Sequence, residues 1–427
     1  MDHIKLTSSS KIYGAVELPG SKSITNRVLL LASLAEGDIT INKPLLSDDT
    51  NYMLSALQQL GIVIEKEDGN IVIKGSNGKF PVKKAELFLG NAGTAFRPLT
   101  AALCLNNGQY TLSGVKRMHQ RPIKDLVDAL FQIGAKVEYI ENQGYPPLAI
   151  YPGKIKYVSP IQIRGDVSSQ FLSSILMAFA LTKNKIKIEI IGDLISKPYI
   201  EITLKLLKQF GIIYINNNWK NFTLQQPAKL KNPKIIEIEG DASSASYFFA
   251  AAAIAGEIEV KGINKNSIQG DIDFLNILKK MGAKILYKKN SIVVSKADNL
   301  IGLKVDCKMI PDAAMTLATL SLFANGPTEL INIGSWRVKE TDRILAMETE
   351  LRKIGAKVSS TQDSIKIYPP KEIYDNIAID TYDDHRMAMC FSLICLAEKN
   401  VIINDPNCVA KTFPNFFNDF TALLNGQ

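Results

Sequence analysis

Apolar segments with helical spacing alternate with short β-branched segments along most of the chain. Several helix-like segments end in a glycine and continue directly as a strand-like run, as in residues 57–64, 130–137 and 351–358. Glycine is favoured just after a helix because the backbone there turns left-handed, which only glycine does without a steric penalty. These glycines recur at intervals of 71 to 77 residues, at positions 61, 134, 211, 282, 355 and 426.

A second feature repeats in step with the glycines. Clusters of Ser, Thr, Asn and Asp, the residues that cap helix N-termini, precede small-residue helical segments. The clusters lie at 21–27, 91–97, 166–170, 241–246, 312–316 and 383–388. The two patterns together predict six α/β units of about 72 residues each.

The sixth unit stops before its last strands, so we expect the N-terminal strand segments at 4–6 and 14–18 to complete it. This closure predicts an α/β protein of two domains with three units each, 21–239 and 1–20 plus 240–427. If equivalent helices point their N-termini inward, a cleft between the domains attracts anions and is the expected active site.

Composition narrows the class of protein. The chain has 427 residues, 46% hydrophobic and 22% charged, which excludes collagen-like and largely disordered proteins. Apolar runs fall short of the roughly 18 residues that span a bilayer, and the N-terminus has no signal-peptide pattern. Five scattered cysteines and three histidines indicate neither a disulfide framework nor a metal site. A cytosolic protein without metal or cofactor is the prediction.

The formal charge of +8 indicates anionic partners. Only nine of the 50 basic residues are arginines. Arginine holds a carboxylate or phosphate with two parallel hydrogen bonds, so arginines retained in a lysine-rich chain are candidates for anion binding. The alternative is that about half of these arginines remain by chance and bind no anion.

The cluster at 20–27 opens a helix with Lys22 at its mouth and Ser23 and Arg27 on one face. The glycines of a P-loop are absent, so an ATPase is disfavoured. Gly93 in a glycine-lined turn allows close approach of a ligand to the backbone. A capped helix with surface charges, or tight helix–strand packing, explains the same residues without function.

Further charged stretches have two interpretations each. If residues 336–343 are helical, Lys339 and Arg343 are like charges on one face, which a shared anion would stabilise, with Glu340 beside them as a proton donor or acceptor. The alternative is a charged exposed helix. Asp312 stands at a helix start, where an ordinary cap is the other explanation.

In this order, the motifs resemble the 5-enolpyruvylshikimate-3-phosphate synthase family. The matching stretches include Leu-Pro-Gly-Ser-Lys-Ser-Ile-Thr-Asn-Arg from residue 18, Trp-Arg-Val-Lys-Glu-Thr-Asp-Arg from residue 336 and Lys-Thr-Phe-Pro ending at residue 414. The resemblance implies the inside-out, barrel-like α/β fold of the enolpyruvyl transferases. It also implies transfer of the enolpyruvyl group of phosphoenolpyruvate to the 5-hydroxyl of shikimate-3-phosphate, in aromatic amino acid biosynthesis.

By the same resemblance, the roles of individual residues follow. Catalysis would fall to Asp312 as the base toward the hydroxyl, and to Glu340 and Lys22 for proton transfer at C3. Shikimate-3-phosphate would be held by Lys22, Ser23, Arg27, Ser168, Ser169, Gln170, Ser196, Asp312, Ser335 and Lys339. Phosphoenolpyruvate would be held by Lys22, Gly93, Arg121, Gln170, Arg343, Arg386 and Lys411. The expected partners are these small molecules, without nucleic acid or membrane, and the expected state is a monomer.

Two positions depart from the family pattern. Ser335 stands where the family commonly has Asn, and Asp383 stands where Asn is usual.

Two alternative functions remain. The sister transferase acting on UDP-N-acetylglucosamine has a cysteine shortly before its Arg-Pro, whereas Met118, His119 and Gln120 precede Arg121 here. An RNA-binding protein would show exposed aromatics beside its basic surface, but aromatics are only 8%.

Overall fold

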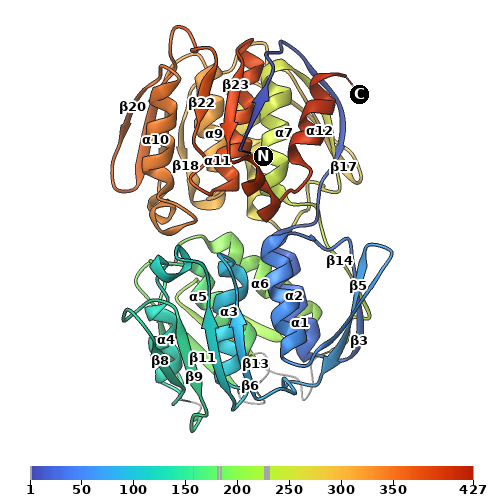
Figure 1. The fold of residues 1–427 in the computed structure, drawn as a ribbon, viewed down its shortest axis with the longest axis vertical. Helices are drawn as coiled ribbons and strands as arrows, with labels where there is room; N and C mark the ends of the chain where they lie inside the picture. The colour runs from blue at the N-terminus through green and yellow to red at the C-terminus, as the bar shows by residue number, and fades with distance from the viewer. Residues whose placement is uncertain (1, 157, 180–181, 183–184, 226–230, 427) are drawn as a thin grey trace. The chain divides into compact units, whose positions relative to one another are not determined.

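The computed structural model describes residues 2–156, 158–179, 182, 185–225 and 231–426. The chain divides into two compact units (Figure 1). Gly20–Ile238 is continuous and is called the inserted unit; Met1–Pro19 and Glu239–Gln427 together form the terminal unit. Among the described residues, no helix combines the length and apolar character that crossing a membrane requires.

The inserted unit contains three four-stranded sheets of one design. Two parallel strands are followed by an antiparallel hairpin, and two helices connect the strands. The sheets, in spatial order, are β14 (Ile235–Glu237), β3 (Glu36–Asn42), β5 (Asn70–Ser76), β4 (Val63–Glu67); β6 (Lys84–Phe88), β7 (Gln109–Ser113), β9 (Leu148–Tyr151), β8 (Lys136–Tyr139); and β10 (Ile161–Arg164), β11 (Ile186–Ile191), β13 (Asn221–Gln225), β12 (Ile213–Asn217). The helices are α1 (Lys22–Leu34), α2 (Asp48–Gln59), α3 (Gly93–Cys104), η1 (Met118–Gln120), α4 (Lys124–Phe131), α5 (Ser169–Phe179) and α6 (Lys197–Gln209).

The terminal unit repeats this design, with a three-stranded sixth sheet. Its sheets are β2 (Ile12–Glu17), β15 (Gly256–Lys261), β17 (Ser291–Ser295), β16 (Lys284–Tyr287); β18 (Lys304–Asp306), β19 (Thr328–Ile331), β21 (Ser364–Tyr368), β20 (Lys357–Ser360); and β22 (Ile377–Ile379), β23 (Val401–Asn404), β1 (His3–Leu6). Its helices are α7 (Ala242–Ala255), η2 (Gly270–Asp273), α8 (Phe274–Met281), η3 (Cys307–Met309), α9 (Ala314–Leu320), η4 (Ser321–Phe323), η5 (Gly334–Val338), α10 (Arg343–Lys353), α11 (His385–Phe391), η6 (Ser392–Ala397), η7 (Pro406–Lys411) and α12 (Phe416–Leu424).

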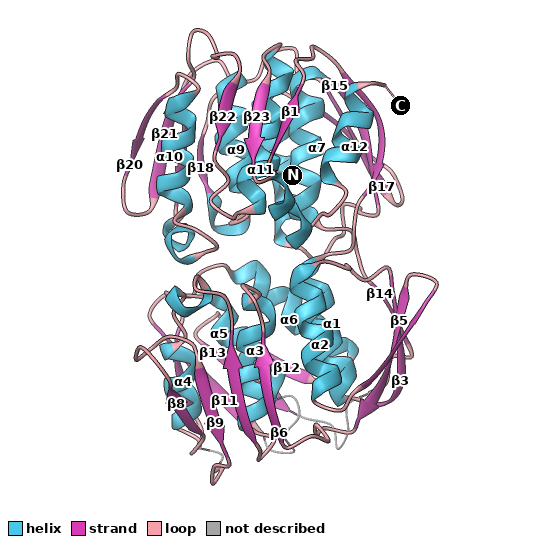
Figure 2. Cartoon of the chain, viewed as in Figure 1, coloured by secondary structure: helices cyan, strands magenta, loops and turns pink. Residues whose placement is uncertain are grey.

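The first helix of each α/β unit is buried along nearly its whole length. In the inserted unit α3 packs against α1 and α5, and in the terminal unit α9 packs against α7 and α11. The second helices, such as α4, bury one face, and the strands alternate buried and exposed positions. The inserted unit and the terminal unit each have helices at the centre and sheets outside (Figure 2). In most α/β proteins, by contrast, the sheet is central and helices cover its faces.

The predicted glycine positions are confirmed. All six glycines have positive φ, from 71° at Gly426 to 115° at Gly282. The six polar clusters also open helices as predicted, at α1, α3, α5, α7, α9 and α11. Asp241 and Asp384 are true caps, since their carboxylates accept hydrogen bonds from the backbone N–H groups of Ser244 and Arg386.

The N-terminal segment was only partly predicted. β1 pairs with β23 and completes the sixth sheet, but β2 pairs with β15 in the fourth. The matching first strand of the first sheet is β14, which comes from the far end of the inserted unit. The prediction that both N-terminal strands finish the sixth unit was therefore wrong for β2. Apolar alternation gives the burial of a strand but not its partner.

A second correction concerns residues 336–343. The predicted single helix is two elements: η5 ends at Val338, and α10 begins at Arg343 behind its cap, Asp342. Lys339 and Arg343 therefore do not share a helical face. They meet instead at Asp312, through two separate ion pairs.

Candidate active site

Arg343 is the most buried cation of the terminal unit, with 1% of its side chain exposed. Its Nε and Nη2 donate to the two oxygens of Asp384 at 2.8 and 3.2 Å. Nη1 donates to Asp312 Oδ1 at 3.0 Å and Nη2 to Glu340 Oε2 at 2.9 Å. Burial alone would lower the pKa of Arg343, but the three carboxylates outweigh it and raise that pKa above its ordinary value. Arg343 is thus a fixed positive charge.

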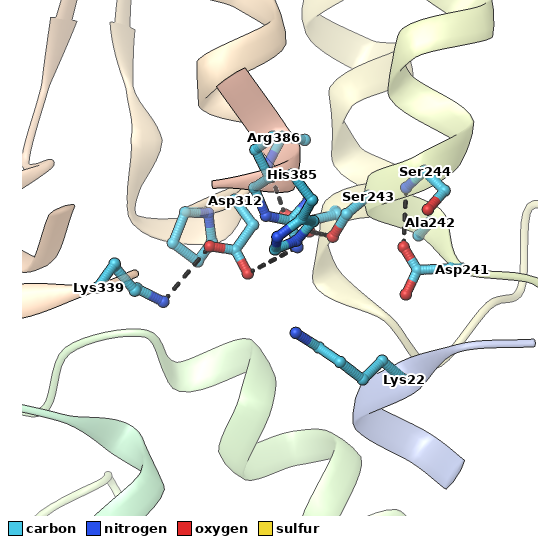
Figure 3. A network of polar contacts seen from close by, with 12 residues as sticks. Lys22, Asp241, Ala242, Ser243, Ser244, Asp312, Lys339, His385 and Arg386 are labelled. Carbon is cyan, nitrogen blue, oxygen red and sulfur yellow. Dashed lines mark hydrogen bonds and ion pairs between the residues drawn. The ribbon is translucent and has the colours of Figure 1, made fainter. Parts of the chain in front are cut away.

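Asp312 is paired with three cations, of which Figure 3 labels Lys339 and Arg386. Besides Arg343, it accepts from Lys339 Nζ at 3.4 Å and from Arg386 Nη2 at 3.1 Å. Asp312 lies in the turn before α9. The indole N–H of Trp336 donates to the carbonyl of Pro311 at 2.7 Å, which ties this turn to η5. The loop that carries Lys339 and Glu340 is thereby fixed against the turn that carries Asp312.

Arg386 is positioned by the start of α11. Its backbone N–H donates to the cap Asp384 at 3.0 Å, and its Nη1 donates to the hydroxyl of Tyr247 at 3.2 Å. The preceding residues, Tyr382 and Asp383, have φ of 56° and 55°. Asp and Asn adopt this left-handed conformation more readily than most residues, so Asp383 suits this position.

Lys411 lies near Asp383 and acts on its carboxyl electrostatically. Burial raises the pKa of the Asp383 carboxyl, while the cation of Lys411 acts in the opposite direction. Lys411 lies at the end of η7 and is 8% exposed. It is therefore close enough to the start of α11 to add to the positive charge there.

The inserted unit holds two of its cations at the start of α1. Lys22 Nζ pairs with Asp49 on α2 at 3.3 Å, and both are buried. Arg27 donates to the Ser23 carbonyl at 2.8 Å and to Thr203 Oγ1 at 2.8 Å. It also donates to two further uncharged oxygens, Ser173 Oγ and the Tyr199 carbonyl. Burial lowers the pKa of Arg27 to about 10, so it remains charged at neutral pH.

Gly93, Arg121 and Gln170 converge at the starts of α3 and α5. A Cβ on Gly93 would lie 3.0 Å from both Arg121 Nη2 and Gln170 Oε1. Arg121 Nη1 donates to the backbone and side-chain oxygens of Asn91, each at 2.9 Å. Arg121 Nε and Gln170 Oε1 are buried, and neither has a hydrogen-bond partner in the described part of the chain. This arrangement is suited to a small ligand.

The five candidate serines lie at or near helix starts, and Ser23 is the second residue of α1. Ser169 begins α5, and Ser168 accepts from the backbone N–H of Gln170 at 3.3 Å. Ser196 precedes α6 with φ of 49°, and Ser335 lies in η5, partly exposed.

The sequence interpretation assigned no role to several residues that hold the site together. Asp384 was part of a quoted motif but was not recognised as the main partner of Arg343. Buried arginines are commonly paired with carboxylates, so the Asp of this motif was a usable signal. Asp49, Tyr247 and Asp271, which are also buried beside candidate residues, have no comparable signal in the sequence.

Comparison with known proteins shows which family the chain is similar to. The family model for EPSP synthase (3-phosphoshikimate 1-carboxyvinyltransferase) matches residues 6–420. A 3-phosphoshikimate 1-carboxyvinyltransferase of Paraburkholderia phymatum is 53% identical over 431 residues, 99% of each chain. One from Cupriavidus taiwanensis is 52% identical over 432 residues, covering 99% of this chain and 100% of the relative.

Solved structures of enolpyruvyl transferases are similar to this chain in fold. An EPSP synthase from Acinetobacter baumannii superposes with a TM-score of 0.82 at 25% identity, over 99% of this chain and 98% of the other. The enolpyruvyl transferase NikO from Streptomyces tendae gives 0.78 at 15% identity, over 99% and 97%, a likeness of fold alone. The fold is that of the enolpyruvyl transferases, which confirms the expected fold class. Because the family model covers nearly the whole chain, this chain belongs to the EPSP synthase (3-phosphoshikimate 1-carboxyvinyltransferase) family.

Proposed function

We propose that this protein transfers the enolpyruvyl group of phosphoenolpyruvate to the 5-hydroxyl of shikimate-3-phosphate and releases phosphate. The observation that carries the proposal is the network in which Asp312 meets Lys339, Arg343 and Arg386. A carboxylate that can take a proton lies among cations that can hold anions. These cations are held by carboxylates before any substrate binds, so little reorganisation is needed during reaction.

The proposed reaction is an addition followed by an elimination. The 5-hydroxyl oxygen attacks C2 of phosphoenolpyruvate and gives its proton to Asp312, while C3 gains a proton. The tetrahedral adduct then expels phosphate, and C3 loses a proton to form the enol ether. Glu340 and Lys22 are the proposed groups for the two proton transfers at C3.

The proposed binding residues come from both units. The substrates carry two phosphates and two carboxylates, whose mutual repulsion in a dry site requires fixed positive charges. Phosphoenolpyruvate is assigned to Lys22, Gly93, Arg121, Gln170, Arg343, Arg386 and Lys411. Shikimate-3-phosphate is assigned to Lys22, Ser23, Arg27, Ser168, Ser169, Gln170, Ser196, Asp312, Ser335 and Lys339. The two sets act together only if both units contribute to one substrate site, which is part of the proposal.

The competing substrate, UDP-N-acetylglucosamine, is disfavoured. The segment before Arg121 is Met118, His119 and Gln120, without the cysteine expected of that sister family. The family match and the 53% identical relative also favour shikimate-3-phosphate. A monomeric state and a cytosolic location stay predictions from the sequence.

The test is phosphate release measured with phosphoenolpyruvate and either shikimate-3-phosphate or UDP-N-acetylglucosamine. Phosphate should appear only with the first pair. Asp312→Ala should reduce turnover by about 10³-fold or more while the circular dichroism spectrum is retained. Asp298→Asn, which changes an exposed aspartate of the same unit, is the matched control and should keep wild-type rates. Wild-type rates in the Asp312 variant would refute its role.

A further inference from the structure

Five of the six helix-opening clusters contain residues with a proposed role, and the cluster that opens α7 does not. In that cluster, Asp241 caps the helix and Ser243 points toward the part of the unit that holds Asp312 and Arg386 (Figure 3). The hydroxyl of Ser243 donates a short hydrogen bond to Oδ2 of Asp271. Asp271 lies in η2 and is 6% exposed. The α7 cluster therefore fixes one buried carboxylate, Asp271.

Asp271 also contacts the turn that carries Asp312. Its Oδ1 accepts from the backbone N–H of Ala313 at 3.4 Å. One oxygen of Asp271 accepts a hydrogen bond from Ser243 of α7 and the other accepts one from the backbone of this turn. Asp271 therefore links the start of α7 to the residue that follows Asp312. Moving the Asp271 side chain would change the position of the Asp312 carboxylate.

The charges around Asp271 come from three elements. Burial raises the pKa of Asp271 to about 6, and the negative charge of Asp312 acts in the same direction. The cation of Arg386 on α11 and the hydrogen bond from Ser243 lower it, while Asp241 raises it slightly. Asp271 and Asp312 are thus two interacting carboxylates that share the field of Arg386, and such pairs titrate together.

We propose that Asp271 is a positioning residue for Asp312. The ionised carboxylate of Asp271 holds the turn that carries Asp312 and, by repulsion, makes Asp312 a stronger base. The inference rests on the proposed function, because it assigns a purpose to the proton that Asp312 takes from the 5-hydroxyl. When Asp271 binds a proton, the repulsion disappears and Asp312 becomes a weaker base. Turnover should then decrease.

The experiment measures kcat with both substrates saturating, from pH 5 to pH 8, for wild type and Asp271→Asn. The wild-type kcat should fall about three- to tenfold as the pH drops through about 6, in addition to any fall seen in the variant. Asp271→Asn should show the lower kcat at both pH 5 and pH 8. Substrate phosphates titrate in the same range, so the difference between the two profiles is the result that counts.

Ser243→Ala is a second, milder variant. It removes the hydrogen bond that stabilises ionised Asp271, so the fall in kcat should move to higher pH. Asp298→Asn should leave the profile unchanged. If Asp271→Asn only lowers kcat equally at all pH values, or Ser243→Ala does not move the fall, the proposal is overturned. If wild type releases no phosphate from this substrate pair, the proposed function itself has failed.

Discussion

Replacing Asp271 with Asn should change how the stability of the terminal unit depends on pH. The pKa of Asp271 is about 6 in the folded protein against an ordinary value of 3.8, because the side chain is buried and faces Asp312. A carboxyl whose pKa is raised by folding stabilises the fold fully below pH 3.8, and this contribution is lost as the pH rises through about 6. From these two values, the contribution is about 1 kcal/mol at pH 5 and close to zero at pH 7.5.

Asp271→Asn cannot take up this proton, whereas carboxylates that do not interact with Asp271 titrate alike in both proteins. The free energy of unfolding of wild type minus that of the variant should therefore be larger at pH 5 than at pH 7.5, by about 1 kcal/mol. Urea unfolding at the two pH values measures it. Trp336 is fully buried in the terminal unit, so its fluorescence reports on that unit once Trp219 is replaced by Phe.

The comparison has a matched control in Asp298→Asn, whose side chain is 90% exposed. That variant should show no pH-dependent difference from wild type. If the Asp271 variant differs from wild type by the same amount at both pH values, or by more at pH 7.5, then Asp271 is not a carboxyl with a raised pKa. The electrostatic part of the further inference would be lost with it.

Three further changes have expected outcomes. Gly93→Ala places a Cβ 2.5 Å from Nη1 of Arg97 and 3.0 Å from Nη2 of Arg121, so the KM for phosphoenolpyruvate should rise about tenfold with that for shikimate-3-phosphate unchanged; a KM for phosphoenolpyruvate equal to that of wild type in steady-state assays would contradict this. Asp384→Asn removes the bidentate partner of buried Arg343 and should cost about 3 kcal/mol in urea unfolding, and a loss under 1 kcal/mol would count against it. Gly256→Ala places a Cβ 1.8 Å from the carbonyl oxygen of Ile12, so unfolding should become easier by about 3 kcal/mol or more; a melting temperature equal to that of wild type would rule out the clash.

The repeated architecture could be predicted because its signals are local. A glycine such as Gly282 follows a helix for a steric reason that acts within a few residues, and the polar clusters cap helices for equally local reasons. The partner of β2 could not be predicted. A strand with alternating burial fits either sheet, and its choice depends on contacts with residues more than 200 positions away.

The candidate site shows the same division. Motifs indicated Asp312, Lys339, Arg343 and Arg386 as candidates, and the structure joins all four in one network of ion pairs. The carboxylates that fix the cations, such as Asp49, were missed because a single Asp in a helix has many ordinary explanations. Which of them is buried beside a cation is decided by packing between distant segments.

The exchange of β2 and β14 has a consequence for the order in which the chain can fold during its synthesis on the ribosome. The inserted unit holds every strand of its three sheets within one continuous stretch, so it can finish as soon as β14 has emerged. β2 must wait for β15, and β1 must wait for β23, nearly 400 residues later. β1 and β2 therefore emerge first, and β1 is among the last strands to find its partner, which leaves nascent strand edges open to aggregation while translation continues.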